Sequence, residues 1–251
     1  MSSRRPFLFA RRLHVRPMIR RLCGGVFAVS TALLFGGAAL AQDPVKVAPN
    51  NYKTAFENDS VRVCEVKAKP GEKVAMHSHP DHLVYAVTAA KFKLTYPDGK
   101  SKDVDVKAGE AMWIKAETHA AENTGAAELK LVVFELKKPA AGGTPSKMHD
   151  AEDQAKVSPE STKVVLDNER VRLLDVRLKG GGKLAKHSHP ANVAYSLTDA
   201  KVKVSTADGK TEERNMTAGQ VIWSGPTTHE VVSAGTAESH VLVVELKEQT
   251  K

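Results

Sequence analysis

Two histidine-rich segments carry the residues best suited to chemistry. His77-Ser78-His79-Pro80 recurs 110 residues later, at 187–190, and a third histidine follows the first histidine of each segment by 42 residues. Imidazole is the commonest protein ligand for transition metals. Residues i and i+2 of a β-strand face the same side, so both histidines of a segment can point into one interior. The pattern predicts two metal sites with open coordination positions, formed by His77, His79 and His119 and by His187, His189 and His229.

The similarity between the two halves extends well beyond the histidines. Duplication of one ancestral domain is the economical explanation, because the matches keep one offset over the length of each half. The matched pairs include Tyr85 and Tyr195, Asp98-Gly99-Lys100 and Asp208-Gly209-Lys210, Gly109 and Gly219, Trp113 and Trp223, and Glu135-Leu136-Lys137 and Glu245-Leu246-Lys247.

Each half has the pattern of a β-sheet domain. Apolar and polar residues alternate over 91–96, which is typical of a half-buried strand. Asp98-Gly99 and Asp208-Gly209 indicate tight hairpin turns, in which glycine accepts a positive φ. The continuous apolar runs at 131–134 and 241–244 indicate strands covered on both faces. We therefore expect an all-β fold in which a barrel brings the third histidine to the other two.

These motifs resemble the cupin family, and the duplication resembles its two-domain members, the bicupins. The first cupin motif, a Gly, five residues and His-x-His, is matched by Gly71 with His77 and His79, and either Gly181 or Gly182 takes the place of Gly71 in the second half. The resemblance covers nearly all of the chain after residue 41. It implies two tandem cupin-type jelly-roll β-barrels, which in this family often hold Mn, Fe, Ni, Zn or Cu.

The second cupin motif, which runs from a Gly to a His and then an Asn, matches less uniformly. Gly109, His119 and Asn123 follow it in the first half, whereas Ser233 replaces the Asn in the second half.

The carboxylate ligand that metal cupins usually carry after His-x-His is missing from both halves. Its position holds Leu83 and Val193 when counted forward from the histidines, or His82 and Asn192 when counted back from the tyrosines. Loss of a negative ligand favours Zn, Fe or Cu over Mn. His82 is a replacement ligand candidate, so we expect the first site to be the stronger one.

Other polar residues near the motifs are pocket candidates. Tyr85, Tyr195 and Asn192 follow the histidines closely enough to line a pocket, although packing with a satisfied hydroxyl is the alternative for the tyrosines. Neither half shows an evident carboxylate base near its histidines.

The first 41 residues have the composition of a cleaved signal peptide. Seven arginines and no acidic residue precede or flank an apolar run at 26–40, which is too short and too rich in Gly and Ala to be a membrane span. We expect export to the periplasm or secretion. The start codon, Met1 or Met18, and the export route, general secretory or twin-arginine, stay open.

Removal of this leader changes the charge argument. The net charge of +8 contains those seven arginines, so the remaining chain carries about +1 and gives no indication of nucleic-acid binding or of a stable membrane span. Cys64 is then the only cysteine, which excludes an internal disulfide and, with Leu174 as its counterpart, favours a buried apolar role.

Composition divides the rest of the chain into two domains of ordinary size. We expect cupin domain 1 at 42–138, a linker at 139–159 that is rich in Ala, Gly, Pro and Lys, and cupin domain 2 at 160–251. The sequence does not determine the oligomeric state.

Three functions fit these residues. The first is a metal-dependent enzyme acting on a small oxygenated molecule, with dioxygenase-like or Lewis-acid chemistry. The second is a non-catalytic protein that binds a metal or small-molecule ligand. The third is a structural bicupin with relic histidines. No motif names the substrate, the reaction or the metal, because cupins share one fold across many reactions.

Overall fold

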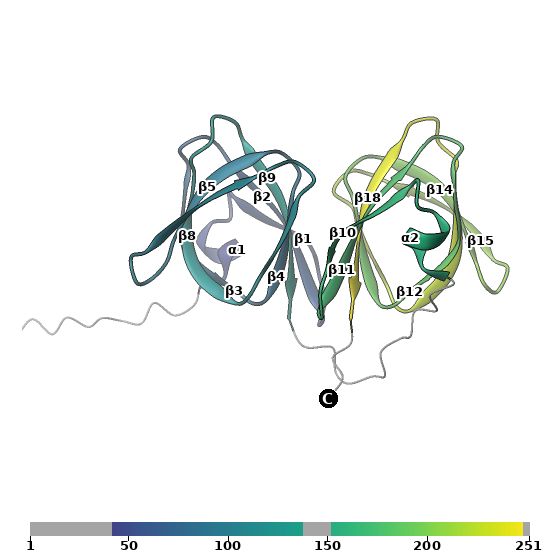
Figure 1. The fold of residues 1–251 in the computed structure, drawn as a ribbon, viewed down its shortest axis with the longest axis horizontal. Helices are drawn as coiled ribbons and strands as arrows, with labels where there is room; N and C mark the ends of the chain where they lie inside the picture. The colour runs from purple at the N-terminus through teal and green to yellow at the C-terminus, as the bar shows by residue number, and fades with distance from the viewer. Residues whose placement is uncertain (1–41, 138–151, 248–251) are drawn as a thin grey trace, which may run out of the picture. The chain divides into compact units, whose positions relative to one another are not determined.

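A computed structural model describes residues 42–137 and 152–247 as two similar units built almost entirely of strands (Figure 1). The predicted leader, 1–41, lies outside the described residues, as do His149 and most of the predicted linker. The first unit contains α1 (Pro44–Val47), β1 (Tyr52–Glu57), β2 (Val61–Ala68), β3 (Lys73–His79), β4 (His82–Ala86), β5 (Ala90–Thr95), β6 (Ser101–Val106), β7 (Ala111–Ile114), β8 (Glu117–Asn123) and β9 (Leu129–Leu136).

The second unit repeats this order. It contains α2 (Gln154–Val157), β10 (Thr162–Asp167), β11 (Val171–Leu178), β12 (Lys183–His189), β13 (Asn192–Ser196), β14 (Ala200–Thr206), β15 (Thr211–Met216), β16 (Val221–Ser224), β17 (Thr227–Ser233) and β18 (Ser239–Leu246).

Each unit is a barrel of two antiparallel sheets. The orders are β1-β2-β9-β4-β7 and β3-β8-β5-β6 in the first barrel, and β10-β11-β18-β13-β16 and β12-β17-β14-β15 in the second. Apart from the consecutive pairs β1–β2, β5–β6, β10–β11 and β14–β15, neighbours in these sheets are not consecutive in sequence, which is the arrangement of a jelly roll. The expected all-β fold of two tandem jelly-roll barrels is confirmed.

Two glycine predictions are decided by backbone conformation. Gly99 and Gly209 both have φ of 81° in the hairpins β5–β6 and β14–β15, as expected of the Asp-Gly turns. Gly181, with φ of 71°, corresponds to Gly71, with φ of 74°, so Gly181 rather than Gly182 is the motif glycine. A side chain at any of these positions would strain the turn.

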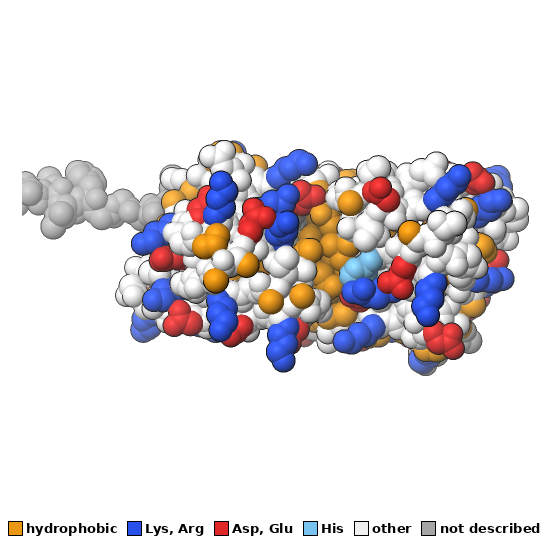
Figure 2. Space-filling model, turned by 90° about the horizontal axis from the view of Figure 1, so that it is seen from above, with side chains coloured by type: hydrophobic (Ala, Val, Ile, Leu, Met, Phe, Trp, Pro, Cys, Tyr) orange, Lys and Arg blue, Asp and Glu red, His pale blue; other side chains and the backbone are white. Residues whose placement is uncertain are grey.

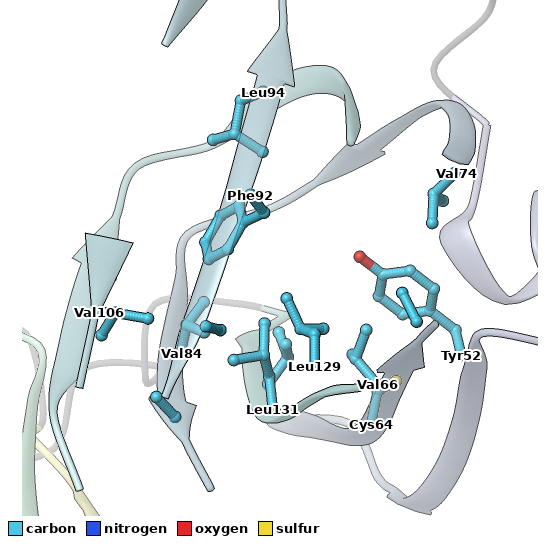
Figure 3. Packing of buried hydrophobic residues seen from close by; sticks show 14 of the residues in the cluster. Tyr52, Cys64, Val66, Val74, Val84, Phe92, Leu94, Val106, Leu129 and Leu131 are labelled. Carbon is cyan, nitrogen blue, oxygen red and sulfur yellow. The ribbon is translucent and has the colours of Figure 1, made fainter. Parts of the chain in front are cut away.

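The interior of each barrel is apolar around the histidines. Figure 3 shows part of the first core, in which side chains from both sheets, such as Phe92, Val66 and Leu131, approach one another. The second core is made of equivalent residues, including Leu174, which stands opposite Cys64 in the repeat. Cys64 is buried and unpaired, in keeping with its expected apolar role.

A further apolar cluster forms from the outward faces of the two five-stranded sheets. Leu83 and Phe134 of the first barrel belong to the same cluster as Leu173 and Leu242 of the second, and all four are fully buried. Strands β4, β9, β11 and β18 are therefore covered on both faces, which explains the continuous apolar runs at 131–134 and 241–244.

The described end of the predicted linker is part of the second barrel. Asp153 caps α2 as Asp43 caps α1, and α2 contacts β12 as α1 contacts β3. The short helices escape prediction because each has only four residues and no apolar periodicity.

Lys and Arg are interspersed with Asp and Glu on the face shown in Figure 2. Within the described residues, no helix has the length and apolarity needed to cross a membrane.

Candidate metal centres

The first barrel brings its three predicted ligands together. His77 and His79 lie on β3 and His119 lies opposite His77 on β8, after an irregularity in the β3–β8 register between Val74 and His77. All three are buried, and one nitrogen from each lies within 4.8 Å of the others. Such a bulge re-aims the side chains that follow it. The predicted convergence of distant strands on one point is thus observed.

Hydrogen bonds fix the orientation of each ring. Nδ1 of His77 donates to the carbonyl oxygen of Ala75 (2.7 Å), Nδ1 of His79 to Glu135 (2.5 Å) and Nδ1 of His119 to Glu117 (2.8 Å). A carbonyl or carboxylate oxygen only accepts, so the proton sits on Nδ1 and the lone pair on Nε2. Metal-binding histidines in proteins are oriented in this way.

Burial disfavours the charged form of two of these imidazoles, those of His77 and His119. It lowers the pKa of His77, and it lowers the pKa of His119 to about 3, assisted by the neighbouring histidines. Since a protonated ring cannot ligate a metal, the lowered pKa of each of these two rings favours its metal-binding form.

His82 lies beside the first triad. Its ring centroid is 4.7 Å from that of His79, and its Nδ1 donates to the carbonyl oxygen of Pro80 (2.8 Å), which leaves its Nε2 free. Burial lowers its pKa to about 4. Leu83 faces the opposite way, into the cluster between the barrels. The position of the missing carboxylate is therefore held by His82 and, in the second barrel, by Asn192.

The second barrel repeats the triad with one fewer hydrogen bond to its histidines. His187, His189 and His229 also bring their nitrogens within 4.8 Å of one another. Nδ1 of His187 donates to Ala185 (2.6 Å) and Nδ1 of His189 to Glu245 (2.7 Å). Thr227 stands where Glu117 stands in the first barrel, and no described carboxylate is bonded to His229.

Each site has a buried carboxylate that sequence reasoning missed. Glu135 and Glu245 lie on the last strand of each barrel and are 1% and 2% exposed. Glu135 also accepts from Arg62 (2.5 Å), which in turn donates to Asp43 (2.6 Å). The signal was the repeated Glu-Leu-Lys, which places a Glu at an inward position of an apolar strand. Neither Glu135 nor Glu245 lines a cavity: each bonds Nδ1 of a triad histidine, so each supports a ring and is not a base facing the pocket.

Arg172 plays the matching part in the second barrel. It donates to both carboxylate oxygens of Asp153 (3.0 Å each) and lies 3.6 Å from Glu245. Both triads are thus connected to a helix cap through a carboxylate and an arginine.

Tyr52 is a second residue that sequence reasoning missed. Its buried hydroxyl lies 3.2 Å from Nε2 of His77, and burial raises its pKa. Its counterpart is Thr162, so the repeat pattern gave no signal for it.

The pocket prediction for Tyr85 and Tyr195 is wrong. On β4, His82 and Val84 face the interior, so the alternation of a strand turns Tyr85 outward into the cluster between the barrels. There Tyr85 donates to Asp175 (2.9 Å) and Tyr195 donates to Glu65 (2.9 Å). Asn192 does line the second cavity, where its amide donates to the carbonyl oxygen of Pro190.

Comparison with known proteins identifies the fold. Residues 64–135 match the family model of the cupin domain. Oxalate decarboxylase from Bacillus subtilis is 14% identical over 80% of this chain and 73% of its own, with a TM-score of 0.58. Another structure of that enzyme, described by its Mn(II) centres, has a TM-score of 0.56 at 14% identity, covering 83% of this chain and 73% of its own. AerE from Microcystis aeruginosa is 12% identical over 79% of this chain and 98% of its own, with a TM-score of 0.54.

None of the curated proteins matches the sequence. At these identities the structural likeness concerns the fold alone: residues 64–135 match the cupin domain, and the chain has the fold of two tandem cupin-type barrels.

The residues present fit the metal ion that this fold often holds. Each triad offers three imidazole nitrogens close to one another, and imidazole suits Zn, Cu and Fe. A cavity of about 60 Å³ adjoins the first triad and one of about 120 Å³ adjoins the second, so the second has more room for a further ligand.

Proposed function

We propose that this chain binds a divalent transition metal in each barrel and that the metal holds a small oxygenated molecule. The ligands would be His77, His79 and His119, with His82 as a fourth donor, and His187, His189 and His229. The observation that carries the proposal is the set of Nδ1 hydrogen bonds, which directs each Nε2 of the first triad toward a common centre.

The donor set favours Zn, Fe or Cu over Mn. The first and second sites offer nitrogen donors, and Leu83 and Val193 add no ligand, because their aliphatic side chains have no donor atom and lie in the cluster between the barrels. A bound ion would supply Lewis-acid chemistry or, with iron, dioxygen chemistry. Around it, Glu135 and Glu245 would hold the rings in place, and Tyr52 would keep a proton on its hydroxyl.

The second candidate function is a non-catalytic metal-binding or ligand-binding protein. It is favoured by the small first cavity, in which His82 and Tyr52 occupy the space beside the triad. Turnover separates the two candidates. Oxygen consumption or hydrolysis by the metal-loaded protein would support an enzyme, and full loading without either would support a binding protein.

Elemental analysis of the purified chain tests the metal proposal. We expect about two ions per chain, one lost in His79→Ala and the other in His189→Ala. His240→Asn is the matched control, because His240 bonds Asp175 outside both cavities and its change should leave both ions bound. A chain without ions, or ions that persist in both alanine variants, would overturn the proposal.

Export remains a separate proposal. It rests on the composition of residues 1–41 and predicts a mature chain that begins near Gln42 in the periplasm or medium. N-terminal sequencing of the fractionated protein tests it, and a cytoplasmic chain that retains the leader would contradict it.

A further inference from the structure

The residues around the two triads differ far more than the triads themselves. At equivalent positions, the second barrel replaces large, apolar or acidic groups of the first with smaller or basic ones. The pairs, first barrel then second, are Tyr52 and Thr162, His82 and Asn192, Phe92 and Val202, Val104 and Arg214, Ile114 and Ser224, and Glu117 and Thr227.

These replacements accompany the larger cavity. The second cavity, about 120 Å³ against about 60 Å³, has walls made chiefly of aliphatic side chains, and its polar groups are few. They comprise the triad, Asn192, Gln154, Arg214, Ser224 and Ser239. A ligand that fills this space must be small, with an aliphatic body and one polar end.

Arg214 is the charged member of this lining. It lies on β15 opposite Val202 of β14, a core residue, so its side chain leaves the strand on the inner face. Arg214 lines the cavity together with His229, and it also lines the outer depression formed with Thr227 and Thr228. Arg214 therefore stands at the mouth of the second cavity, close to the triad.

The balance of charge around the two triads differs accordingly. In the first barrel, Glu135 and Glu117 are bonded to the imidazoles and would neutralise a dication. In the second, only Glu245 is bonded to the triad, and Arg214 adds a positive charge. The pairs Arg62–Asp43 and Arg172–Asp153 cancel within each barrel.

Charged groups outside the cavities do not cancel this difference in charge between the two triads. Glu212, which accepts from Arg214, has a side chain 67% exposed, and its counterpart Lys102 is exposed as well. Charges in such positions are screened by water and salt. A dication in the second barrel would leave positive charge in the cavity that an anionic ligand can neutralise.

We propose that the second barrel is the ligand-binding one and takes a short-chain aliphatic carboxylate, whose carboxylate lies between the triad and Arg214 while its chain packs on the aliphatic wall. The first barrel holds its ion with four imidazoles and has no place for this ligand. The inference rests on the proposed metal site. Beyond that site, it specifies which barrel binds the ligand, the chemical class of the ligand and the residue that recognises the carboxylate.

Calorimetric titration with butyrate tests the inference on the purified chain with its metal. We expect one butyrate per chain, and weaker binding of butyramide, which has the same size and no charge. His240→Asn, the control of the metal measurement, should leave butyrate binding unchanged, and His189→Ala should remove it. Arg214→Val, which installs the residue of the first barrel, should weaken binding about tenfold, because a charge-assisted Arg–carboxylate contact is lost.

A second variant keeps the inference testable if Arg214→Val fails to fold. Val202→Phe narrows the cavity to the pattern of the first barrel and should weaken butyrate binding while Arg214 stays in place. Two butyrates per chain, binding lost in His79→Ala alone, or equal binding of butyramide would each overturn the inference.

Metal content measured on the same samples separates the two proposals. Two ions per chain without butyrate binding would overturn the carboxylate inference and leave the metal proposal standing. A metal-free chain would overturn the metal proposal. If that chain still bound one butyrate and lost it in Arg214→Val, the anion site would be supported independently.

Discussion

The two barrels share one metal-binding framework and differ in the space around it. The histidine triad, the buried Glu, the Arg and the capping Asp recur at an offset of 110 residues, whereas much of the cavity lining does not. The framework depends on contacts between several elements, so a change in one member disturbs the rest. Duplication thus preserved the ligands and let the two cavities diverge.

The carboxylate–arginine contacts offer the largest test of this comparison. Glu135 holds Arg62 at 2.5 Å, whereas Arg172 is held by both oxygens of Asp153 and lies 3.6 Å from Glu245. Glu135→Ala should lower the free energy of unfolding by about 3–5 kcal/mol, because it leaves a buried cation short of a partner. Glu245→Ala should lower the free energy of unfolding by a smaller amount. Urea denaturation of the metal-free protein measures both, and equal losses would show that the two arginines depend on their Glu alike.

The Asn of the second cupin motif offers the next test. Asn123 donates to the carbonyl oxygens of Ala68 and Ala127 and accepts from Gly125, whereas Ser233 makes one long bond of 3.4 Å to Gly235. Asn123→Ser should therefore lower the free energy of unfolding by about 1–3 kcal/mol, since buried backbone groups lose their partners. The same denaturation measurement applies, with Ser78→Ala as a control on β3. A cost within error of the control would mean that water replaces the amide.

Exchange of His82 and Asn192 tests the difference in ligand number. His82→Asn should weaken the metal affinity of the first site at least about tenfold, since even groups that only orient a ligand change affinity about 10- to 100-fold. Asn192→His should strengthen the second site. Competition with a chelator of known affinity measures both, and unchanged affinity in both variants would place His82 outside the coordination sphere.

Acid sensitivity gives the smallest expected difference. The pKa values of His82 and His119, about 4 and about 3, lie below the ordinary 6.5, so the unfolded chain binds protons before the folded chain does. Stability of the metal-free protein should be complete above about pH 6.5 and fall as the pH drops toward 4. His82→Asn removes one such group and should make the variant lose about 1 kcal/mol less than wild type by pH 5.5. Parallel pH profiles of the two proteins would contradict this.

The sequence was informative where a pattern is local or repeated. The Asp-Gly turns, the alternation over 91–96 and the apolar runs predicted strands that the structure contains, because hairpin φ angles and strand period act within a few residues. The repeat fixed both triads. It did not reveal the roles of Glu135 and Glu245, although both belong to a repeated tripeptide, since a Glu in an apolar strand gives no sign of its partner.

For Tyr85 and Tyr195 the error was of the other kind: the sequence suggested a functional position that the structure does not give them. Their position near the histidines suggested a pocket, yet neighbouring residues of a strand face opposite sides, and the odd spacing from His82 turns Tyr85 away. The sequence of β4 does not tell which of its faces is the barrel interior. The tertiary structure does, because Tyr85 points to the other face and donates its hydroxyl proton to Asp175 of the second barrel.

The amino-acid order alone therefore determined the duplicated β architecture and the identity of six candidate ligands, because period and repetition are written along the chain. Tertiary structure decided which nitrogen of each ring is free, which carboxylate orients it, and how large and how charged each cavity is. Those properties arise from contacts between strands that are far apart in the chain, and no local pattern records them.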